Sequence, residues 1–377
     1  MRIGINARCL QMSRAGIAQY VYYLLLSLKA VDRKNQYVLF LGSNNYIYED
    51  IENLDFLCDV SKMSTKNQFF KIAWQHLYLP VRIKKMGIDV FHEPTFVAPY
   101  FKKCPTVITI HDLSYKLLPD CYTLRNRLYL EWLMERSINS SDKIIAISEN
   151  TKRDLLLNYR IKEEKVKVVY EGVDEAFCPV ADLNDGSLDM VKAKYGIKGD
   201  FILTVSLISP RKNMVNLIRA FSMLKRKKQI DHQLVIVGKK GWLYKEVFEE
   251  AVASGYKKDI IFCDFVPQYD LVSLYNAAAV FVYPSLYEGF GLPLLEAMAC
   301  DCPVVASNCS SIPEVCADAA LLVDPHDSAA FADAIFRILS DMALRKSLIE
   351  KGRARVSILS WKKTAEETIK IYNSAAV

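Results

Sequence analysis

The sequence of 377 residues lacks the features that would place it across a membrane or among small secreted proteins. No stretch approaches the roughly 18 uninterrupted apolar residues of a membrane-spanning helix. The first residues, MRIGINARCL, have the pattern of a β-strand and not of a signal peptide. Low-complexity segments and short-period repeats are also absent. With 51% hydrophobic and 24% charged residues, we expect an ordinary soluble globular chain.

The ten cysteines do not form the closely spaced framework of a small disulfide-rich domain. Several lie in apolar, strand-like surroundings, as Cys263 does in IIFCDFV, which predicts reduced thiols in a cytosolic protein. A metal site is the alternative for four of them: Cys300, Cys302, Cys309 and Cys316. Their pattern, C-x-C followed by two six-residue gaps, is not a common zinc spacing, so we expect no metal.

The net charge of +6 is unevenly distributed along the chain. Residues 1–170 hold 25 Lys and Arg against 17 Asp and Glu, a net charge of +8. The remainder holds 24 against 26, a net charge of −2. The positive excess therefore belongs to the first half.

The segment from Val60 to Ile88 contains no Asp or Glu. Its basic residues alternate with aromatic ones: Lys62, Lys66, Lys71, Arg82, Lys84 and Lys85 with Phe69, Phe70, Trp74 and Tyr78. This mixture suits an anionic membrane surface. The alternative is one amphipathic helix that packs its aromatic face into the core and breaks at Pro80. No nucleic-acid-binding module is recognisable, so nucleic acid is not an expected partner.

Short β-branched runs alternate with longer helical patterns along the whole chain, which is typical of parallel sheets covered by helices. In the first half the expected strands are Arg2–Asn6, Tyr37–Leu41, Asp89–His92, Thr106–His111, Lys143–Ile147 and Val166–Tyr170. The second half repeats the scheme at Phe201–Ser206, Gln233–Gly238, Asp259–Phe262, Val280–Tyr283, Pro303–Ser307 and Ala320–Val323. We therefore predict an α/β fold of two doubly wound parallel-sheet units in tandem.

The chain length also favours two domains. The segment 175–187 is rich in Pro, Asp, Asn and Gly, which predicts a linker between a first domain, residues 1–174, and a second, residues 188–359. Ser360–Ala375 has the pattern of an amphipathic helix, and we expect residues 360–377 to pack back onto the first domain.

The stretch LYEGFGLPLLEAMAC places Glu288 and Glu296 on either side of a glycine-rich loop that follows the strand Val280–Tyr283. Pro293 suits the first helical position and Leu294–Ala299 are good helix formers. The free N–H groups of a helix start favour an anionic ligand, whereas a carboxylate accepts two hydrogen bonds from a diol such as ribose. The loop therefore predicts a nucleotide that carries a sugar; the alternative is a capped helix with no ligand.

Other candidate residues lie at or after strand ends, where ligands of such sheets bind. Arg211 and Lys212 follow the strand Phe201–Ser206 and could bind a diphosphate, although a solvated basic turn is the alternative. His111 ends its strand and could contact a sugar or a phosphate, but a lone histidine there is more often structural. Gly16 would allow the backbone to approach a phosphate closely.

Five motifs in order resemble a known family: His111-Asp112, AISENTKRDL (146–155), GVD (172–174), SPRKN (209–213) and E-x7-E (288–296). They are similar to those of family-4 glycosyltransferases of the GT-B fold, whose two Rossmann-like domains face a cleft. The similarity is strongest to the mannosyltransferase-B-like group, which helps to assemble bacterial O-antigens and exopolysaccharides. It extends over nearly the whole chain.

The resemblance implies retaining, metal-independent transfer of a hexose from a nucleotide sugar, with GDP-mannose the favoured donor and no other cofactor. Its catalytic residues would be Glu288, Arg211, Lys212 and His111, the last contacting the sugar from the opposite domain. Its donor-binding residues would be Glu296, Gly289, Phe290, Gly291, Leu292, Gly16 and Val266, with Glu296 on the ribose and the backbone near Phe265-Val266 against the base.

The resemblance also implies a lipid-linked saccharide as acceptor and a place at the cytoplasmic face of the plasma membrane, in peripheral contact with anionic lipid. Three alternatives remain open at this point. A related transferase would use UDP-glucose or UDP-N-acetylglucosamine. A nucleotide-sugar epimerase would act on the donor alone, and a non-catalytic subunit would only bind it. A dinucleotide oxidoreductase is not expected, because no G-x-G-x-x-G follows the first strand.

Overall fold

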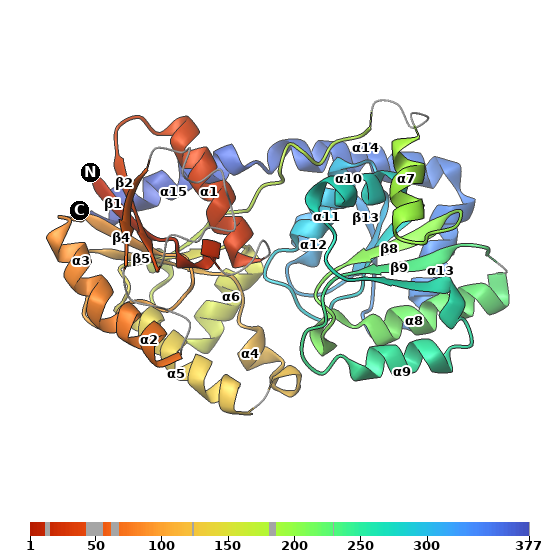
Figure 1. Cartoon of the computed structure of the whole chain (residues 1–377), viewed down its shortest axis with the longest axis horizontal. Coiled ribbons are helices and arrows are strands. Elements are labelled where there is room, and N and C mark those ends of the chain that lie inside the picture. The colour runs from red at the N-terminus through yellow and green to blue at the C-terminus, as the bar shows by residue number, and fades with distance from the viewer. Residues whose placement is uncertain are drawn as a thin grey trace. The chain divides into compact units, whose positions relative to one another are not determined.

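The computed structural model describes residues 1–11, 16–42, 56–61, 68–122, 124–180, 186–228 and 230–376. The chain divides into two compact units, of which the first comprises Met1–Gly172 with Ser360–Val377 and the second Val173–Leu359. Each unit contains one parallel sheet with helices packed around it (Figure 1). The predicted α/β fold with two doubly wound sheets is confirmed.

The first unit contains a sheet of seven strands in the order β3-β2-β1-β4-β5-β6-β7. Its strands are β1 (Arg2–Asn6), β2 (Gln36–Leu41), β3 (Leu57–Val60), β4 (Val90–Glu93), β5 (Thr106–Ile110), β6 (Lys143–Ala146) and β7 (Val166–Val168). Its helices are η1 (Arg8–Gln11), α1 (Ile17–Val31), α2 (Gln68–Ala73), η3 (Trp74–Tyr78), α3 (Leu79–Lys85), α4 (Ser114–Leu117), η4 (Pro119–Cys121), α5 (Leu124–Ser140), α6 (Glu149–Asn158), η5 (Glu163–Lys165) and α15 (Trp361–Ala375). The central strand β4 and its neighbour β5 are buried along their whole length, as expected of parallel strands covered on both faces.

The second unit contains a sheet of six strands in the order β10-β9-β8-β11-β12-β13. Its strands are β8 (Phe201–Val205), β9 (Gln233–Val237), β10 (Ile260–Cys263), β11 (Val280–Tyr283), β12 (Val304–Ser307) and β13 (Ala320–Val323). Its helices are α7 (Ser187–Lys194), η6 (Pro210–Lys212), α8 (Met214–Met223), η7 (Leu224–Lys228), α9 (Lys245–Ala253), η8 (Lys257–Asp259), α10 (Gln268–Ala277), α11 (Leu292–Ala299), α12 (Ile312–Cys316), α13 (Ser328–Ser340) and α14 (Met342–Ile358). Leucine, isoleucine, valine and phenylalanine from α8, α13 and the sheet form one continuous core.

Both sheets reverse their strand order at an equivalent place. The chain runs outward from β1 to β2 and β3 and then returns to the other side of β1 with β4. It repeats this path with β8, β9 and β10 before returning with β11. In sheets of this kind, ligands bind outside the carboxyl ends of the two strands that flank the reversal. The carboxyl ends of β1 and β4, and of β8 and β11, are therefore the places to examine for function.

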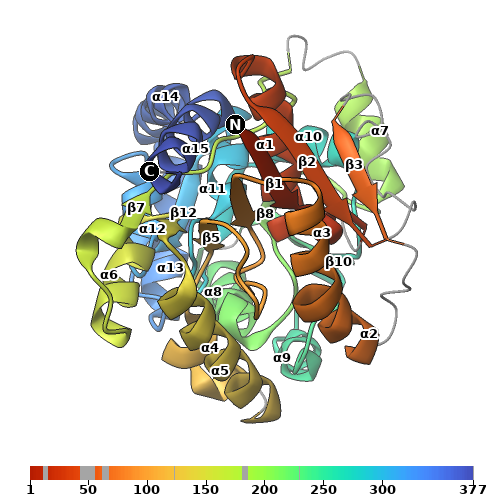
Figure 2. The ribbon, with the colours of Figure 1, turned by 90° about the vertical axis from the view of Figure 1, so that its left-hand side faces the viewer.

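The helix α15 belongs to the first unit, although it follows the second unit in the sequence. It lies along α1 (Figure 1, Figure 2). Trp361 stacks on Tyr23 with ring centroids 5.4 Å apart, and the Tyr372 hydroxyl lies 2.7 Å from Nδ1 of the buried His92. A Cβ atom on Gly172 would lie 2.1 Å from the backbone nitrogen of Trp361, so only glycine fits where the chain leaves this unit.

The segment expected to be a linker is packed over its described part. The Val180 amide donates to Oδ1 of Asn276 at 2.8 Å, and Nδ2 of Asn276 donates to the carbonyl of Cys178 at 3.0 Å. The Phe177 ring meets the edge of Tyr275. These contacts fix the segment to α10 of the second unit, while residues 181–185 lie outside the described residues.

The chain from Gln68 to Lys85 follows one helical path, because the π-helical turn η3 joins α2 directly to α3. The alternative of one amphipathic helix is correct for this part of the segment, except that the helical path does not break at Pro80. Pro80 is the second residue of α3 and directly follows the π-helical turn η3, in which the Leu79 amide bonds the carbonyl of Trp74 five residues earlier. Trp74 in this path is fully buried in the core of the first unit, whereas Lys62 and Lys66 lie outside the described residues.

Candidate active site

The carboxyl ends of β8 and β11 hold three of the predicted residues in one ion cluster. Nη1 of Arg211 lies 2.9 Å from Oε2 of Glu288, and Nζ of Lys212 lies 2.5 Å from Oε1 of the same carboxylate. Lys212 and Glu288 are both more than nine-tenths buried. The sequence predicts that the two cations bind a diphosphate and that Glu288 binds a sugar, but it does not indicate that the three side chains contact one another.

Both loops of this cluster are joined by backbone groups as well as by charge. Nη1 of Arg211 also donates to the carbonyl of Tyr287 at 2.6 Å, and the amide of Leu286 donates to the carbonyl of Arg211 at 2.9 Å. Nζ of Lys212 donates to the hydroxyl of Tyr283, the last residue of β11, at 3.1 Å. The two basic side chains are therefore held in place before any ligand arrives.

Electrostatics keep the cluster ionised. Burial on its own would raise the pKa of Glu288, but the positive charges of Arg211 and Lys212 outweigh it and bring the pKa down to about 2. Glu288 is therefore a carboxylate at neutral pH. One carboxylate facing two cations leaves the cluster with a net charge of +1, which favours an anionic ligand.

Asn213 fixes the loop that carries the two cations. Its backbone is in the left-handed region, with φ of 55°. Its side-chain amide donates to the carbonyls of Pro284 at 3.0 Å and Pro325 at 2.7 Å. The last residue of the SPRKN motif thus ties the loop after β8 to the loops after β11 and β13.

The glycine-rich loop after Glu288 leads into α11. Gly291 caps this helix with φ of 110°, a conformation that strongly favours glycine. The Glu288 amide donates to Oγ of Ser310 at 2.9 Å, and the Ser311 hydroxyl lies 3.0 Å from the carbonyls of both Glu288 and Phe290. The sequence analysis did not identify these two serines, because nothing in their local sequence indicates contact with a loop some 20 residues earlier.

Glu296 lies on α11, four residues after Leu292, the first residue of the helix, and is almost fully buried. Its Oε2 accepts a hydrogen bond from the Tyr275 hydroxyl at 2.9 Å. Burial and the adjacent Glu296 raise the pKa of Tyr275 well above its ordinary value, so the hydroxyl keeps its proton and remains a donor. The sequence analysis missed Tyr275, because α10 reads as an ordinary helix.

Val266, which the resemblance placed near the nucleobase, is buried just beyond the carboxyl end of β10. Its neighbour Phe265 is exposed, and the ammonium of Lys239 lies 5.1 Å from the centre of its ring. Lys239 follows β9, so both residues lie at the same carboxyl edge as the ion cluster. The second unit, which holds the ion cluster, also contains four predicted donor-binding residues: Gly289, Phe290, Leu292 and Val266.

The remaining predicted residues, His111 and Gly16, belong to the first unit. Nε2 of His111 lies 2.9 Å from the Pro94 carbonyl and therefore carries the proton, while Nδ1 lies 3.7 Å from a carboxylate oxygen of Glu171. The ring meets the edge of Tyr20 at 4.9 Å. Gly16 precedes α1 with φ of 58°, so the backbone conformation requires glycine there although the space around it is open.

The carboxyl ends of β1 and β4 hold a second buried carboxylate, Glu93, which the sequence analysis missed. Its Oε2 accepts hydrogen bonds from Nδ2 of Asn6 at 2.7 Å and from Nε2 of Gln75 at 2.8 Å. Its Oε1 accepts from the amide of Thr95 at 3.0 Å and from the hydroxyl of the same residue. Burial raises the pKa of Glu93, and these hydrogen bonds offset only part of that rise.

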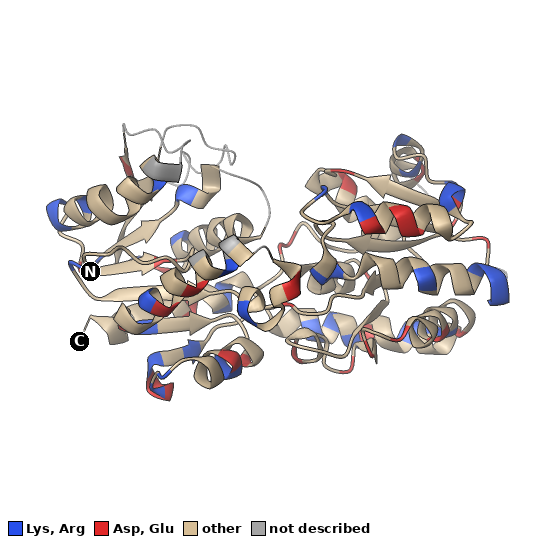
Figure 3. Cartoon of the chain, turned by 90° about the horizontal axis from the view of Figure 1, so that it is seen from below, with Lys and Arg blue, Asp and Glu red and all other residues tan. Residues whose placement is uncertain are grey.

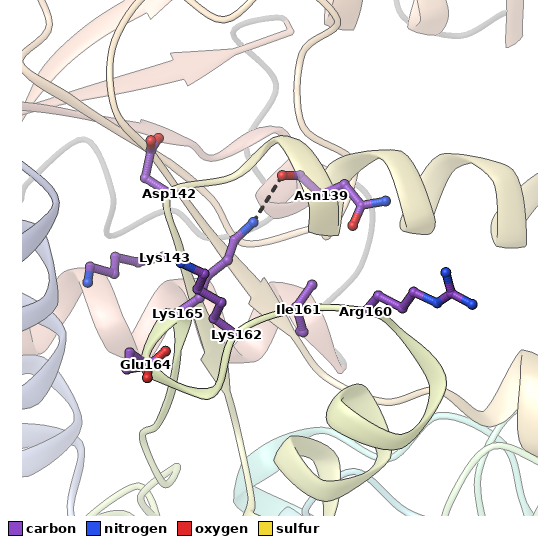
Figure 4. A pocket seen from close by; sticks show the side chains of 8 residues that line it. All are labelled: Asn139, Asp142, Lys143, Arg160, Ile161, Lys162, Glu164 and Lys165. Atoms are coloured by element: carbon purple, nitrogen blue, oxygen red, sulfur yellow. Dashed lines mark hydrogen bonds between the residues drawn. The ribbon is translucent and has the colours of Figure 1, made fainter.

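Among the described residues, no three His, Cys, Asp or Glu side chains lie close enough together to hold a metal ion. Metal independence stays a prediction. A surface pocket of about 380 Å³ lies at the amino ends of β6 and β7, at the opposite edge of the first sheet from Glu93 (Figure 4). It is lined by Asn139, Asp142, Lys143, Arg160, Ile161, Lys162, Glu164 and Lys165. Its position excludes it as the switch-point site.

Residues 190–355 match the family described as glycosyl transferases group 1, and residues 14–177 match glycosyltransferase family 4. O-antigen chain mannosyltransferase B of Escherichia coli is 31% identical to this chain over 285 residues, which cover 75% of this chain and 74% of the relative. The chain belongs to the family-4 glycosyltransferases. It is therefore an enzyme of the hexosyltransferase type, as the sequence analysis predicted.

Other relatives extend this picture of the glycosyltransferase. The serotype-specific mannosyltransferase WbdA of Escherichia coli is 32% identical over 271 residues, which cover 70% of this chain but only 33% of WbdA. The crystal structure of HepE from Anabaena in complex with UDP-glucose superimposes with a TM-score of 0.78 at 18% identity, covering 99% of this chain and all of HepE. This likeness confirms the GT-B fold. No helix in the described part of the enzyme is long and apolar enough to cross a bilayer.

Proposed function

We propose that this glycosyltransferase transfers mannose from GDP-mannose, with retention at the anomeric carbon, to a lipid-linked saccharide. The product would be a cell-surface polysaccharide of the O-antigen or exopolysaccharide type, built at the cytoplasmic face of the plasma membrane. The names of the relatives support the choice of mannose, since mannosyltransferase B and WbdA are both mannosyltransferases, the first of O-antigen chains.

The observation that carries the proposal is the ion cluster at the carboxyl ends of β8 and β11. A diphosphate that approaches it meets the partly buried guanidinium of Arg211 and the buried ammonium of Lys212, both already oriented by Glu288. The net charge of +1 supplies part of the neutralisation that a metal ion provides in other transferases. We therefore propose that transfer proceeds without a metal.

The chemical step breaks the bond between the anomeric carbon of mannose and the β-phosphate oxygen. The electron pair leaves with GDP, while the acceptor hydroxyl oxygen attacks the same face of the sugar and its proton passes to a β-phosphate oxygen. Arg211 and Lys212 stabilise the charge that develops on the leaving diphosphate. By comparison with oxyanion donors in other enzymes, each contributes about 3 kcal/mol to lowering the barrier.

The alternative retaining route would need a carboxylate nucleophile below the sugar ring. Glu288 is poorly suited to this role, because each of its oxygens holds a cation at 2.5–2.9 Å. A carboxylate with a pKa of about 2 is also a weak nucleophile. We therefore propose that Glu288 and the amides of the Gly289–Gly291 loop bind the hydroxyls of the donor sugar, while retention comes from same-face attack.

Glu296 is proposed to bind the two ribose hydroxyls. The Tyr275 hydroxyl occupies one side of Oε2, which orients the carboxylate without neutralising it. The exposed Phe265 ring at the same sheet edge offers a surface for the base, beside the backbone of Val266. Neither contact distinguishes guanine from uracil, so the choice of GDP rests on the mannosyltransferase relatives.

Calorimetric titration of the purified enzyme with GDP, UDP, ADP and dTDP, and then with their hexose conjugates, tests the donor. Selective binding of GDP and GDP-mannose is expected. Selective binding of UDP would move the donor to UDP-glucose or UDP-N-acetylglucosamine and leave the class of reaction intact. No binding by any of them would contradict the assignment of the ion cluster.

Transfer itself is tested with GDP-mannose, a lipid-linked saccharide and a chelator, with the product analysed by NMR. Retention predicts an α-mannoside from the α-linked donor, and metal independence predicts the same rate with and without chelator. Isomerisation of GDP-mannose in the absence of any acceptor would instead identify an epimerase.

A further inference from the structure

The first unit carries an unusually apolar surface around α5. Seven large hydrophobic residues there are at least half exposed: Leu77, Val81, Tyr100, Phe101, Leu124, Leu128 and Trp132. We refer to these residues as the α5 surface. An exposed tryptophan with several exposed leucines and aromatic rings is more than the isolated apolar residues that any protein surface shows.

Helix geometry aligns three of these residues on one side of α5. Leu124, Leu128 and Trp132 are spaced by four residues and are all strongly exposed. The opposite side, which includes Met134 and Ile138, is buried in the core of the unit. The helix is thus apolar on both sides, and the outer stripe has no partner in the described part of the chain.

Side-chain and backbone contacts join the stripe on α5 to the Tyr100 loop and to η3. Arg136, one turn after Trp132, places its guanidinium 3.3 Å from the centre of the Tyr100 ring and donates to the Tyr100 carbonyl at 2.8 Å. The amide of Tyr100 donates in turn to Nδ1 of His76 at 3.1 Å. His76 lies on η3, next to Leu77. The loop at Tyr100 therefore bridges α5 and η3, which places the exposed residues of the helices and of the loop on neighbouring segments.

Basic residues surround this surface. Lys102 and Lys103 follow Phe101 directly and are exposed, as are Lys84 and Lys85 at the end of α3. Lys102 also forms an ion pair with Asp142. Basic and acidic residues are interspersed over the helices of the protein (Figure 3). Arginines and glutamates both occur along α5, and Glu131 is paired with Lys116 at 2.9 Å. Glu135, one turn further along α5, and Asp120 on η4 are exposed as well, so charges of both signs occur in this part of the unit.

We propose that the α5 surface is the part of this enzyme that rests on an anionic lipid bilayer. Leucine and aromatic side chains would enter the boundary between headgroups and acyl chains, while Lys84, Lys85, Lys102 and Lys103 would contact lipid phosphates. A protein partner is less suited, because flexible lysines with aromatic rings match a fluid anionic surface better than one fixed interface. The inference rests on the proposed function only in that a lipid-linked acceptor would require such an anchor.

This surface differs from the membrane segment expected from the sequence, Val60–Ile88. Trp74, the largest aromatic residue of that segment, is buried in the core. Only the outer side of the helical path, with Leu77 and Val81, takes part in the α5 surface. The larger share comes from α5 and the Tyr100 loop, which the charge pattern did not indicate.

Sedimentation of the full-length enzyme with lipid vesicles tests the proposal without donor or acceptor. We expect binding to vesicles of phosphatidylcholine mixed with phosphatidylglycerol, weaker binding to phosphatidylcholine alone, and a decrease as salt approaches 1 M, where charges are screened beyond about 3 Å. The double variant Leu128→Glu/Trp132→Glu should lower the bound fraction by at least about tenfold, since it puts two charges where apolar side chains would insert.

The matched control is Leu157→Glu on α6 of the same unit, since Leu157 is 76% exposed and lies outside the α5 surface. It should bind vesicles like the unchanged enzyme. Both variants should fold normally, because all three substituted positions are exposed. Circular dichroism checks this. Transfer to a short water-soluble acceptor should be unchanged in both, which separates anchoring from catalysis.

Three results would overturn the proposal. They are no binding to any vesicle, equal loss of binding in the Leu157→Glu control, and a dimer in solution that Leu128→Glu/Trp132→Glu dissociates. The last result would assign the surface to a second copy of the chain. Failure of the donor titration would leave vesicle binding intact, so the two proposals fail separately.

Discussion

Each sheet carries one buried carboxylate at its switch point, and the two carboxylates differ in what surrounds them. Glu93 in the first unit is enclosed by the neutral donors Asn6, Gln75 and Thr95. Glu288 in the second unit faces Arg211 and Lys212. Burial raises the pKa of Glu93, whereas the two cations lower the pKa of Glu288 to about 2.

The difference indicates two roles for one position in the same topology. The neutral donors around Glu93 come from β1, from η3 and from the loop after β4, so the carboxylate joins three parts of the first unit. The cations around Glu288 are themselves suited to bind a ligand, so that carboxylate orients a charged site. The comparison predicts that changes at Glu288 affect catalysis and stability, and that changes at Glu93 affect mainly stability.

The largest expected effect is on catalysis at Lys212. Lys212→Ala should lower the rate of transfer about 100- to 1000-fold, because one donor to the leaving diphosphate is lost. The fold should persist, since Glu288 keeps Arg211 as a partner. Steady-state transfer kinetics measure the effect, with the exposed Lys258→Ala of the same unit as the control. A rate within threefold of that of the unchanged enzyme corresponds to a change in the barrier of about 0.7 kcal/mol at most. Such a result would show that Lys212 does not bind the leaving diphosphate.

The next effect is on stability at Glu288. Glu288→Gln leaves two buried cations without their counter-charge, which should cost about 3–5 kcal/mol in the free energy of unfolding at neutral pH. The depressed pKa means that this contribution is present above the ordinary glutamate pKa and is lost as pH falls toward about 2. Urea unfolding at a series of pH values should show the difference from the unchanged enzyme narrowing on acidification. A difference in unfolding free energy that stays constant with pH would contradict the ion cluster. The control is Glu246→Gln, at an exposed position.

Glu93 should show a smaller effect with the opposite pH dependence. Glu93→Gln disturbs hydrogen bonds to buried donors and should cost about 1–3 kcal/mol at low pH. Because the folded pKa of Glu93 is raised, its protonated form contributes stability below the ordinary glutamate pKa, and this is lost as pH rises through the raised value. The difference from the unchanged enzyme should therefore shrink on alkalisation. If it grew instead, Glu93 would be stabilised as an anion and the contrast with Glu288 would fail.

The smallest expected effect is at Tyr275. Tyr275→Phe removes one neutral hydrogen bond to Glu296 and should weaken binding of the nucleoside diphosphate by about 0.5–1.5 kcal/mol, or two- to tenfold. Calorimetry measures it, with Tyr269→Phe on the same helix as control, since that side chain is 76% exposed. Unchanged affinity would show that Tyr275 does not orient a ribose-binding carboxylate.

The strands were largely predictable, because apolar β-branched runs between turn residues leave little choice in a doubly wound sheet. β1, β11 and β13 have the bounds that the sequence predicts. β3 was not predicted, since its four residues, LCDV, are half exposed at the sheet edge and contain an aspartate. That aspartate, Asp59, is held by the guanidinium of Arg82, a contact that no local pattern indicates.

The candidate site was predictable in its residues and not in its contacts. The motif around Glu288 and the pair Arg211 and Lys212 could each be found from local sequence. Their mutual ion pairs span 76 and 77 positions and depend on β8 lying next to β11. Glu93 was missed because the expected strand ended at His92, which left the acid looking like a loop residue although it is completely buried.

The packing of α15 on α1 bears on how the chain is made. A ribosome completes residues 1–172 and then the whole of 173–359 before it reaches Trp361, so the first unit waits for its last helix while the second can already fold. During that interval the buried faces of Tyr20 and Tyr23, which Trp361 covers in the finished protein, are open to other nascent chains. We therefore expect the interrupted unit to expose apolar surface for longer during synthesis, although its synthesis begins first.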